Sequence, residues 1–103
     1  MYSIYQIDSN GKEKIIGNVD ITNDFLPYIT KYLKQYVPLA KITYIDKYHG
    51  NCPDGFYLLN NGHDIRLIQN IKVRRVGYLY NISAVSTKIL FTWRLIEHDD
   101  NKL

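Results

Sequence analysis

The chain has 103 residues, which is enough for one domain and too few for two. Hydrophobic residues make up 46% and charged residues 22%, which fits a folded globular protein and excludes a disordered chain, a collagen-like filament and a coiled coil. The net charge is +3, and without a dense run of Lys and Arg this charge alone is weak support for nucleic-acid binding.

Simple sequence patterns limit where the protein is expected to be located and what its cysteine can do. The longest apolar run, residues 56–59, is far shorter than the roughly 20 residues that span a bilayer. Residues 1–6 lack the basic segment and apolar core of a secretory signal, so we expect an intracellular protein. The single cysteine, Cys52, excludes an internal disulfide, a four-thiolate zinc site and a two-cysteine redox motif.

The first predicted unit is a β-hairpin. Residues 2–7 lead into Asn10-Gly11, a pair that favours a type I′ turn because both of its residues tolerate positive φ. The following run alternates with period two, which predicts a strand with one apolar face formed by Ile15, Gly17, Val19 and Ile21.

A helix is predicted next. Residues 22–24 are N-cap candidates, and Pro27 falls in the first turn, where its missing N–H is tolerated. Pro38 marks the end of the helix. One side of the helix is apolar, with the stripe Phe25, Ile29, Leu33 and Tyr36.

The rest of the chain predicts five more strands. They are expected within residues 41–48, 56–60, 64–73, 76–80 and 85–95. Turn-forming residues separate the first three, at 49–55 and at Asn61-Gly62. Alternation predicts one apolar face in each of two strands, with Ile65, Leu67, Ile71 and Val73 in one and Val85, Ile89, Phe91, Trp93 and Leu95 in the other.

These elements predict an α+β fold in the order ββαβββββ. Short connections favour antiparallel neighbours, so we expect a twisted or partly barrel-like sheet of about seven strands with the helix stripe across one face. A single domain is expected over residues 1–97, followed by a solvated tail over residues 98–103.

Few residues are suited to metal binding or catalysis. His49, Cys52, His63 and His98 are the soft metal ligands of the sequence, and His49 with Cys52 has the spacing of half a zinc site or of a nucleophile and its base. The alternative is that these residues decorate a turn-rich loop. That interpretation is favoured because the fourth ligand would have to be His98 in the tail or a carboxylate, and because no catalytic signature surrounds Cys52. We therefore predict no catalytic residue, no metal and no cofactor.

One basic segment is interleaved with aromatic residues. Its members are Lys72, Arg74, Arg75, Tyr78 and Tyr80, an array that neutralises phosphates and stacks bases in single-strand-binding proteins. The alternative is that the tyrosines pack in the sheet while the basic residues are solvated.

The 10 tyrosines favour protein contact, because a rigid ring with one hydroxyl gives contact area at low entropy cost. The sequence therefore predicts a non-enzymatic protein-binding or structural module that self-associates through an edge strand, as in a homodimer. A single-stranded nucleic-acid-binding module that uses the basic segment is the alternative function.

Two segments resemble a known group of proteins. Cys-Pro-Asp-Gly-Phe-Tyr-Leu-Leu at 52–59 and Ile-Lys-Val-Arg-Arg-Val-Gly-Tyr-Leu-Tyr-Asn at 71–81 look like segments of small proteins of large, mimivirus-like DNA viruses that infect amoebae. The bias toward Ile, Lys, Asn and Tyr is similar too. The resemblance implies a viral protein made in the host cytoplasm, packaged in the virion or directed at a host partner, and it carries over no catalytic residue.

Overall fold

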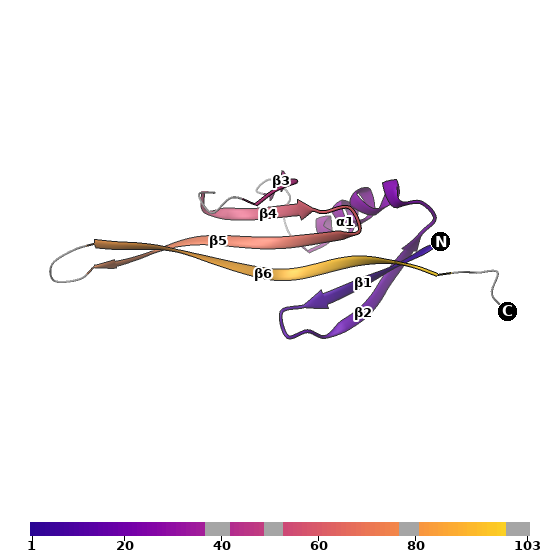
Figure 1. Ribbon diagram of the computed structural model, residues 1–103, viewed down its shortest axis with the longest axis horizontal. Coiled ribbons are helices and arrows are strands. Elements are labelled where there is room, and N and C mark those ends of the chain that lie inside the picture. The colour runs from indigo at the N-terminus through magenta and orange to yellow at the C-terminus, as the bar shows by residue number, and fades with distance from the viewer. Residues whose placement is uncertain (37–41, 49–52, 77–80, 99–103) are drawn as a thin grey trace.

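The computed structural model describes residues 1–36, 42–48, 53–76 and 81–98 of the chain. These residues form an α+β fold in which one α-helix packs against a six-stranded mixed sheet with the strand order β2-β1-β6-β5-β4-β3 (Figure 1). Every neighbouring pair is antiparallel except β3 and β4. The elements are β1 (Tyr2–Asp8), β2 (Glu13–Val19), a 3-10 turn (Thr22–Asp24), α1 (Phe25–Lys34), β3 (Ile42–Ile45), β4 (Gly55–Asn60), β5 (Asp64–Val76) and β6 (Asn81–Glu97).

The hairpin of β1 and β2 is confirmed, but its predicted turn type is wrong. A type I′ turn needs positive φ at both central residues, whereas no described residue other than glycine has positive φ. Gly11 alone takes this conformation, with φ of 83°, and its N–H donates to the carbonyl of Asp8 at 3.0 Å. The turn therefore needs only one left-handed residue, a position that glycine occupies without steric cost.

A β-bulge divides the apolar residues of β2 between the two faces of the sheet. The register passes from Ile4 opposite Gly17 to Tyr5 opposite Ile15, so Ile16 is an extra residue on the β2 side. Ile15 consequently lies on the opposite face from Gly17 and Val19. The prediction that these three residues share one face was wrong, because it assumed uninterrupted alternation.

The helix follows its sequence signals closely. It begins at Phe25 after the 3-10 turn, holds Pro27 in its first turn and ends at Lys34. Phe25, Ile29 and Leu33 are buried as predicted. Tyr36 lies beyond the helix and is 67% exposed, so it is not part of the buried stripe.

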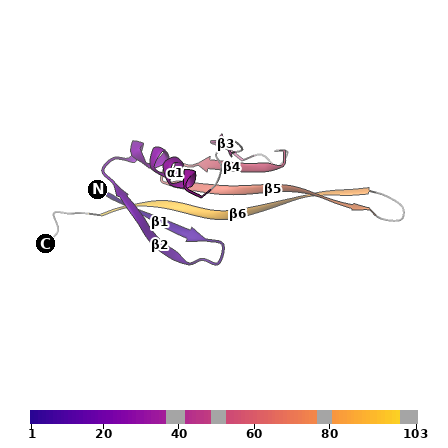
Figure 2. The ribbon, with the colours of Figure 1, turned by 180° about the vertical axis from the view of Figure 1, so that it is seen from behind.

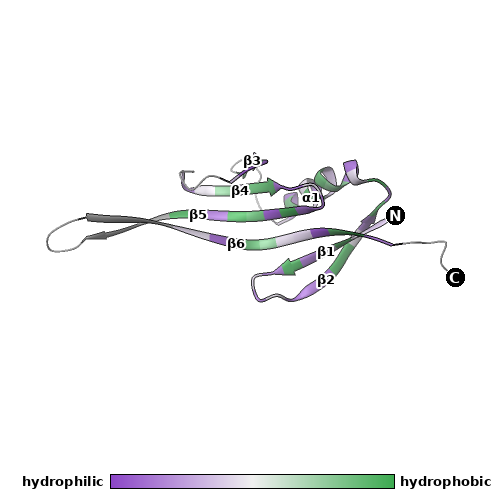
Figure 3. Cartoon of the chain, viewed as in Figure 1, coloured by the Kyte–Doolittle hydropathy of each residue, from purple (hydrophilic) through white to green (hydrophobic). Residues whose placement is uncertain are grey.

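The main core lies between α1 and one face of the sheet. Hydrophobic and polar residues alternate along the strands in Figure 3, as expected for strands with two different environments. Strands from both ends of the chain contribute to this core, whose fully buried members include Ile4, Phe25, Ile29, Leu58, Ile65 and Trp93.

A smaller core lies on the opposite face, over β4 and β5. Tyr57, Leu59 and Ile68 are buried there, with Tyr48 packed against them. The segment that joins the parallel strands β3 and β4 therefore brings a side chain over this face. The Tyr48 hydroxyl lies 2.9 Å from Oδ1 of the buried Asn70, to which it donates a hydrogen bond.

The hairpin of β5 and β6 extends beyond the rest of the sheet. β4 ends its pairing with β5 at Asn70, and β1 ends its pairing with β6 at Phe91. Beyond these points β5 and β6 pair with each other as far as Val76 and Asn81, which gives a protruding two-stranded ribbon (Figures 1 and 2).

This ribbon contains the start of the strand predicted over residues 76–80. Residues 64–76 form one strand because Arg74-Arg75 contains no residue that breaks an extended chain, so Val76 ends β5 rather than beginning a separate strand. Residues 77–80 lie outside the described residues. The described elements follow the order ββαββββ, so the seven strands and the order ββαβββββ are not confirmed. The parallel pair of β3 and β4 makes the sheet mixed rather than antiparallel.

A second bulge shifts the faces of β6. Leu67 pairs with Phe91 and Ile68 pairs with Ile89, so Leu90 is an extra residue in β6. The buried Trp93 and Leu95 lie on the helix side as predicted, whereas Ile89 lies with Ile68 on the other face.

Candidate functional site

The basic segment predicted from the sequence lies partly on the ribbon. Lys72, Arg74 and Arg75 belong to β5, where they pair by register with residues 85, 83 and 82 of β6. Tyr78 and Tyr80 lie outside the described residues. The structure therefore brings three of the five predicted residues onto one protruding element.

All of the charged residues in the ribbon segment are basic. Between residues 71 and 90 the sequence holds four basic residues, Lys72, Arg74, Arg75 and Lys88, and no Asp or Glu. Because the ribbon extends past the rest of the sheet, this segment is separated along the sheet from the acidic residues of the N-terminal hairpin and of the 3-10 turn. A basic arm of this kind suits a polyanion.

A second candidate surface was not predicted from the sequence. Within the described part of the chain, α1 covers one face of β2, β1 and β6, and no element packs on the other face of these strands. We call this second surface the open face. Cross-strand register and exposure define it by the residues Tyr5, Ile7, Ile15, Thr92, Arg94 and Ile96.

The open face is rich in exposed aliphatic side chains. Ile15 is 57% exposed and Ile96 is 44% exposed, while Tyr5 and Ile7 on the same face are partly exposed. These side chains share the face with the polar residues Ser3, Thr92 and Arg94, which lie in the same cross-strand rows. Exposed apolar side chains bordered by polar residues are typical of contact with another protein.

Charged residues border the open face at both ends. One row across the strands runs from Ile15 through Tyr5 and Arg94 to Asp64, because each of these residues pairs with the next. The next row begins at Glu13, which pairs with Ile7, and ends in β5 at Arg66, which pairs with Thr92. An acidic residue therefore lies at the β2 end of this row and a basic residue at its β5 end.

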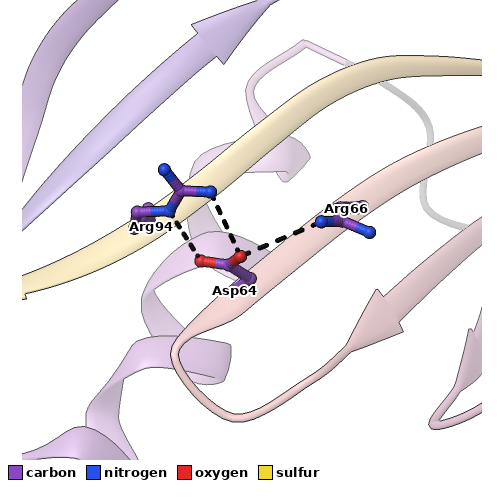
Figure 4. Close-up of polar contacts among 3 residues, drawn as sticks. All are labelled: Asp64, Arg66 and Arg94. Carbon is purple, nitrogen blue, oxygen red and sulfur yellow. Dashed lines mark hydrogen bonds and ion pairs between the residues drawn. The ribbon is translucent and has the colours of Figure 1, made fainter.

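The basic end is organised around one carboxylate (Figure 4). Arg94 donates from Nε to Oδ1 of Asp64 at 3.0 Å and from Nη2 to Oδ2 at 3.4 Å. Nη2 of Arg66 lies 4.0 Å from the same Oδ2. The hydrogen bonds to Asp64, followed by its charge, raise the pKa of Arg94. Two guanidinium groups thus share one carboxylate, and the cluster keeps a net positive charge.

The possible metal ligands do not form a site among the described residues. His63 lies in the exposed turn between β4 and β5, with its ring centroid 6.2 Å from that of Tyr2. His49 and Cys52 lie outside the described residues, so the structure does not test their association with His63. In the part of the chain that is described, no group of three or more His, Cys, Asp or Glu residues is arranged to hold a metal ion.

Comparisons with known proteins leave the family open. No family model, no curated protein and no solved structure matches this chain. Among the described residues, no helix has both the length and the apolar character needed to cross a membrane.

Proposed function

We propose that this chain is a non-enzymatic protein-binding module that self-associates by packing the open face of one copy against that of another. The observation that carries the proposal is the exposure of Ile15 and Ile96 on sheet strands whose opposite face is packed against α1. Burial of exposed aliphatic surface favours association by about 25 cal/mol for each Å² removed from water. Packing two sheets face to face is the usual way to bury such a surface.

Charge favours a second copy as the partner. In a two-fold arrangement the same surface serves both partners, so it must be complementary to itself. Glu13 at the β2 end and Arg66 at the β5 end supply opposite charges at the two ends of one row. An antiparallel arrangement of the two open faces places Glu13 of each copy toward Arg66 and Arg94 of the other.

The open face is a better candidate for association than the edge of β2. The bulge at Ile16 interrupts the ladder, and bulges protect edge strands from pairing with another chain. The Ile16 carbonyl already accepts a hydrogen bond from the Tyr28 hydroxyl at 2.8 Å. Exposed Glu13 and Lys14 add charges to the same strand. These features oppose the edge-strand pairing predicted from the sequence and favour contact through the face.

Light scattering coupled to size-exclusion chromatography tests this proposal. We expect the parent chain to elute as a dimer, and Ile96→Glu to be monomeric at the same concentration because it places a carboxylate in the apolar interface. Ile21→Glu is the matched control, since Ile21 is 54% exposed and lies outside the sheet. A monomeric parent chain, or dimers of equal stability in both variants, would contradict the proposal.

The resemblance to proteins of large DNA viruses supports a setting for this function. We propose that the self-associating module acts in the cytoplasm of an infected host cell or within the viral particle. Detection with an antibody in infected cells and in purified particles tests the two locations separately.

A second candidate function is single-stranded nucleic-acid binding by the ribbon. It is favoured by the basic residues between positions 71 and 90, which no acidic residue accompanies. Each phosphate contact on a single strand makes the logarithm of the binding constant fall about 0.7 more steeply with the logarithm of the salt concentration. If all four basic side chains contact phosphates, binding should therefore weaken roughly 50-fold between 50 and 200 mM salt. The variant with Lys72→Gln, Arg74→Gln and Arg75→Gln should lose most of this dependence. Salt-independent binding, or no binding at low salt, would exclude this candidate.

A further inference from the structure

A pocket of about 290 Å³ lies on the helix side of the sheet, beyond the last turn of α1. Its floor is formed by strands, with Gln6 and Trp93 in one cross-strand row and Phe91 and Leu67 in the next. Its roof comes from the end of the helix and the residues that follow, namely Tyr32, Leu33 and Tyr36. The pocket exists because the helix ends before the apolar face of the sheet does.

The walls of this pocket are mainly aromatic. The rings of Phe91 and Trp93 stack with centroids 5.8 Å apart and an interplanar angle of 24°. Tyr32 and Tyr36 lie opposite them in the roof as a tilted pair, with centroids 5.1 Å apart. Trp93 is fully buried, so the rings accessible to a ligand are those of Phe91 in the floor and of Tyr32 and Tyr36 in the roof, which suit an aromatic group.

Polar groups at the pocket are held in place. The Trp93 indole donates from Nε1 to Oε1 of the buried Gln6 at 3.0 Å, which fixes the orientation of the indole. Burial, followed by the neighbouring Tyr36 hydroxyl, raises the pKa of Tyr32.

Lys14 gives the pocket a charge. It pairs with Gln6 across the strands, is exposed, and is the one charged side chain among the described residues that line this pocket. Asp8 pairs with Phe91 nearby, but its Oδ1 accepts hydrogen bonds from the N–H groups of Asn10 and Lys12, both at 2.9 Å. The Asp8 carboxylate is thus bonded to the hairpin turn, and Lys14 remains to bind an anion at the pocket.

We propose that this pocket binds a small aromatic acid, with its ring between Phe91, which stacks on the buried Trp93, and the two tyrosines, and with its carboxylate at Lys14. The volume suits one or two fused rings, and pockets for small ligands commonly combine apolar walls with a few placed polar groups. The site is separate from the open face, because it lies on the side of the sheet that α1 covers.

NMR titration tests this site directly, because the chain has a single tryptophan and therefore one indole N–H cross-peak in a ¹⁵N spectrum. The probes are 2-naphthoate and its neutral counterpart 2-naphthamide. We expect naphthoate to shift the Trp93 cross-peak in a saturable way and to bind more tightly than naphthamide. A cross-peak that moves with neither probe, or equal affinities for both, would overturn the proposal.

Matched variants separate the anion site from general surface charge. Lys14→Gln should weaken naphthoate binding about fivefold, the value for a partly exposed ion pair, and leave naphthamide binding unchanged. Lys12→Gln removes an exposed lysine two positions away and should leave both affinities unchanged. Tyr36→Ala should weaken both probes because it removes a roof ring. Equal losses in Lys14→Gln and Lys12→Gln would overturn the assignment of Lys14, and unchanged binding in Tyr36→Ala would overturn the position of the ring.

Discussion

Gly17→Ala tests the contact between the helix and β2. The φ of Gly17 is not in the left-handed region, so alanine fits the backbone, and such a substitution ordinarily stabilises a protein by about 0.4–1 kcal/mol through the unfolded state. The site around Gly17 is crowded, so we expect alanine to destabilise the protein instead. A Cβ atom there would overlap the hydroxyl oxygen and the adjacent ring carbon of Tyr28.

The size of the destabilisation depends on the contacts that Tyr28 loses when its ring is displaced. Its hydroxyl donates to the Ile16 carbonyl at 2.8 Å, and a displaced ring would lose this hydrogen bond, at about 1 kcal/mol. Overpacking adds about 1–3 kcal/mol. These costs total about 2–4 kcal/mol, and the unfolded-state gain offsets about 0.4–1 kcal/mol of them. We therefore expect Gly17→Ala to lower the free energy of unfolding by about 1–3.5 kcal/mol, measured by urea denaturation.

Tyr28→Phe separates the two contributions. It removes the hydroxyl without introducing a clash and should cost about 1 kcal/mol, the value of one hydrogen bond. The double variant should cost less than the sum of the two single variants, because the deleted hydroxyl is the group nearest to the added methyl. Costs that add within about 0.5 kcal/mol, or a Gly17→Ala variant as stable as the parent, would refute the contact.

Three further predictions concern the contact between α1 and the sheet. Leu33→Ala should lower the free energy of unfolding by about 2–5 kcal/mol, because this buried side chain joins α1 to the sheet; urea denaturation identical to that of the parent would contradict the helix placement. Gln6→Leu should cost about 1–3 kcal/mol in the same assay, because it leaves the buried Trp93 indole N–H without an acceptor; Gln6→Glu, which keeps an acceptor oxygen, is the comparison. The raised pKa of Tyr32 stabilises the fold below about pH 10, and this contribution is lost as the pH rises through the folded pKa. Thermal denaturation should therefore show a loss of stability in strong alkali that is smaller in Tyr32→Phe.

The sequence predicts local structure well where a short stretch of neighbouring residues determines it. Phe25, Ile29 and Leu33 recur at helical spacing and are buried together, and Pro27 falls in the first turn as expected. The sequence predicts pairing less well, because pairing depends on contacts between distant residues. The parallel pair of β3 and β4 requires a connection that crosses over the sheet, and no local pattern distinguishes that connection from a hairpin loop.

The candidate site depends even more on tertiary structure. The basic residues Lys72, Arg74 and Arg75 were identified from composition, and the ribbon that carries them follows from an uninterrupted run of strand-compatible residues. The open face was missed, since its residues are spread over β2, β1 and β6 and come together only through register. The aromatic pocket was also missed, because Tyr36 was assigned to the buried helix stripe.

The two bulges move isoleucines to the face of the sheet opposite α1, and the bulge in β2 places Ile15 on the open face. Alternation assigns Ile15 to the face of Gly17 and Val19, and Ile89 to the face of Phe91 and Trp93. Each bulge adds one residue, which moves the isoleucine before it to the opposite face. Ile15 thereby joins the open face, and Ile89, which is 46% exposed, lies on the same side of the sheet next to Ile68. Without the bulges both side chains would lie on the helix side. The bulge that weakens sequence prediction in β2 therefore also places Ile15 on the surface through which we propose that the protein binds its partner.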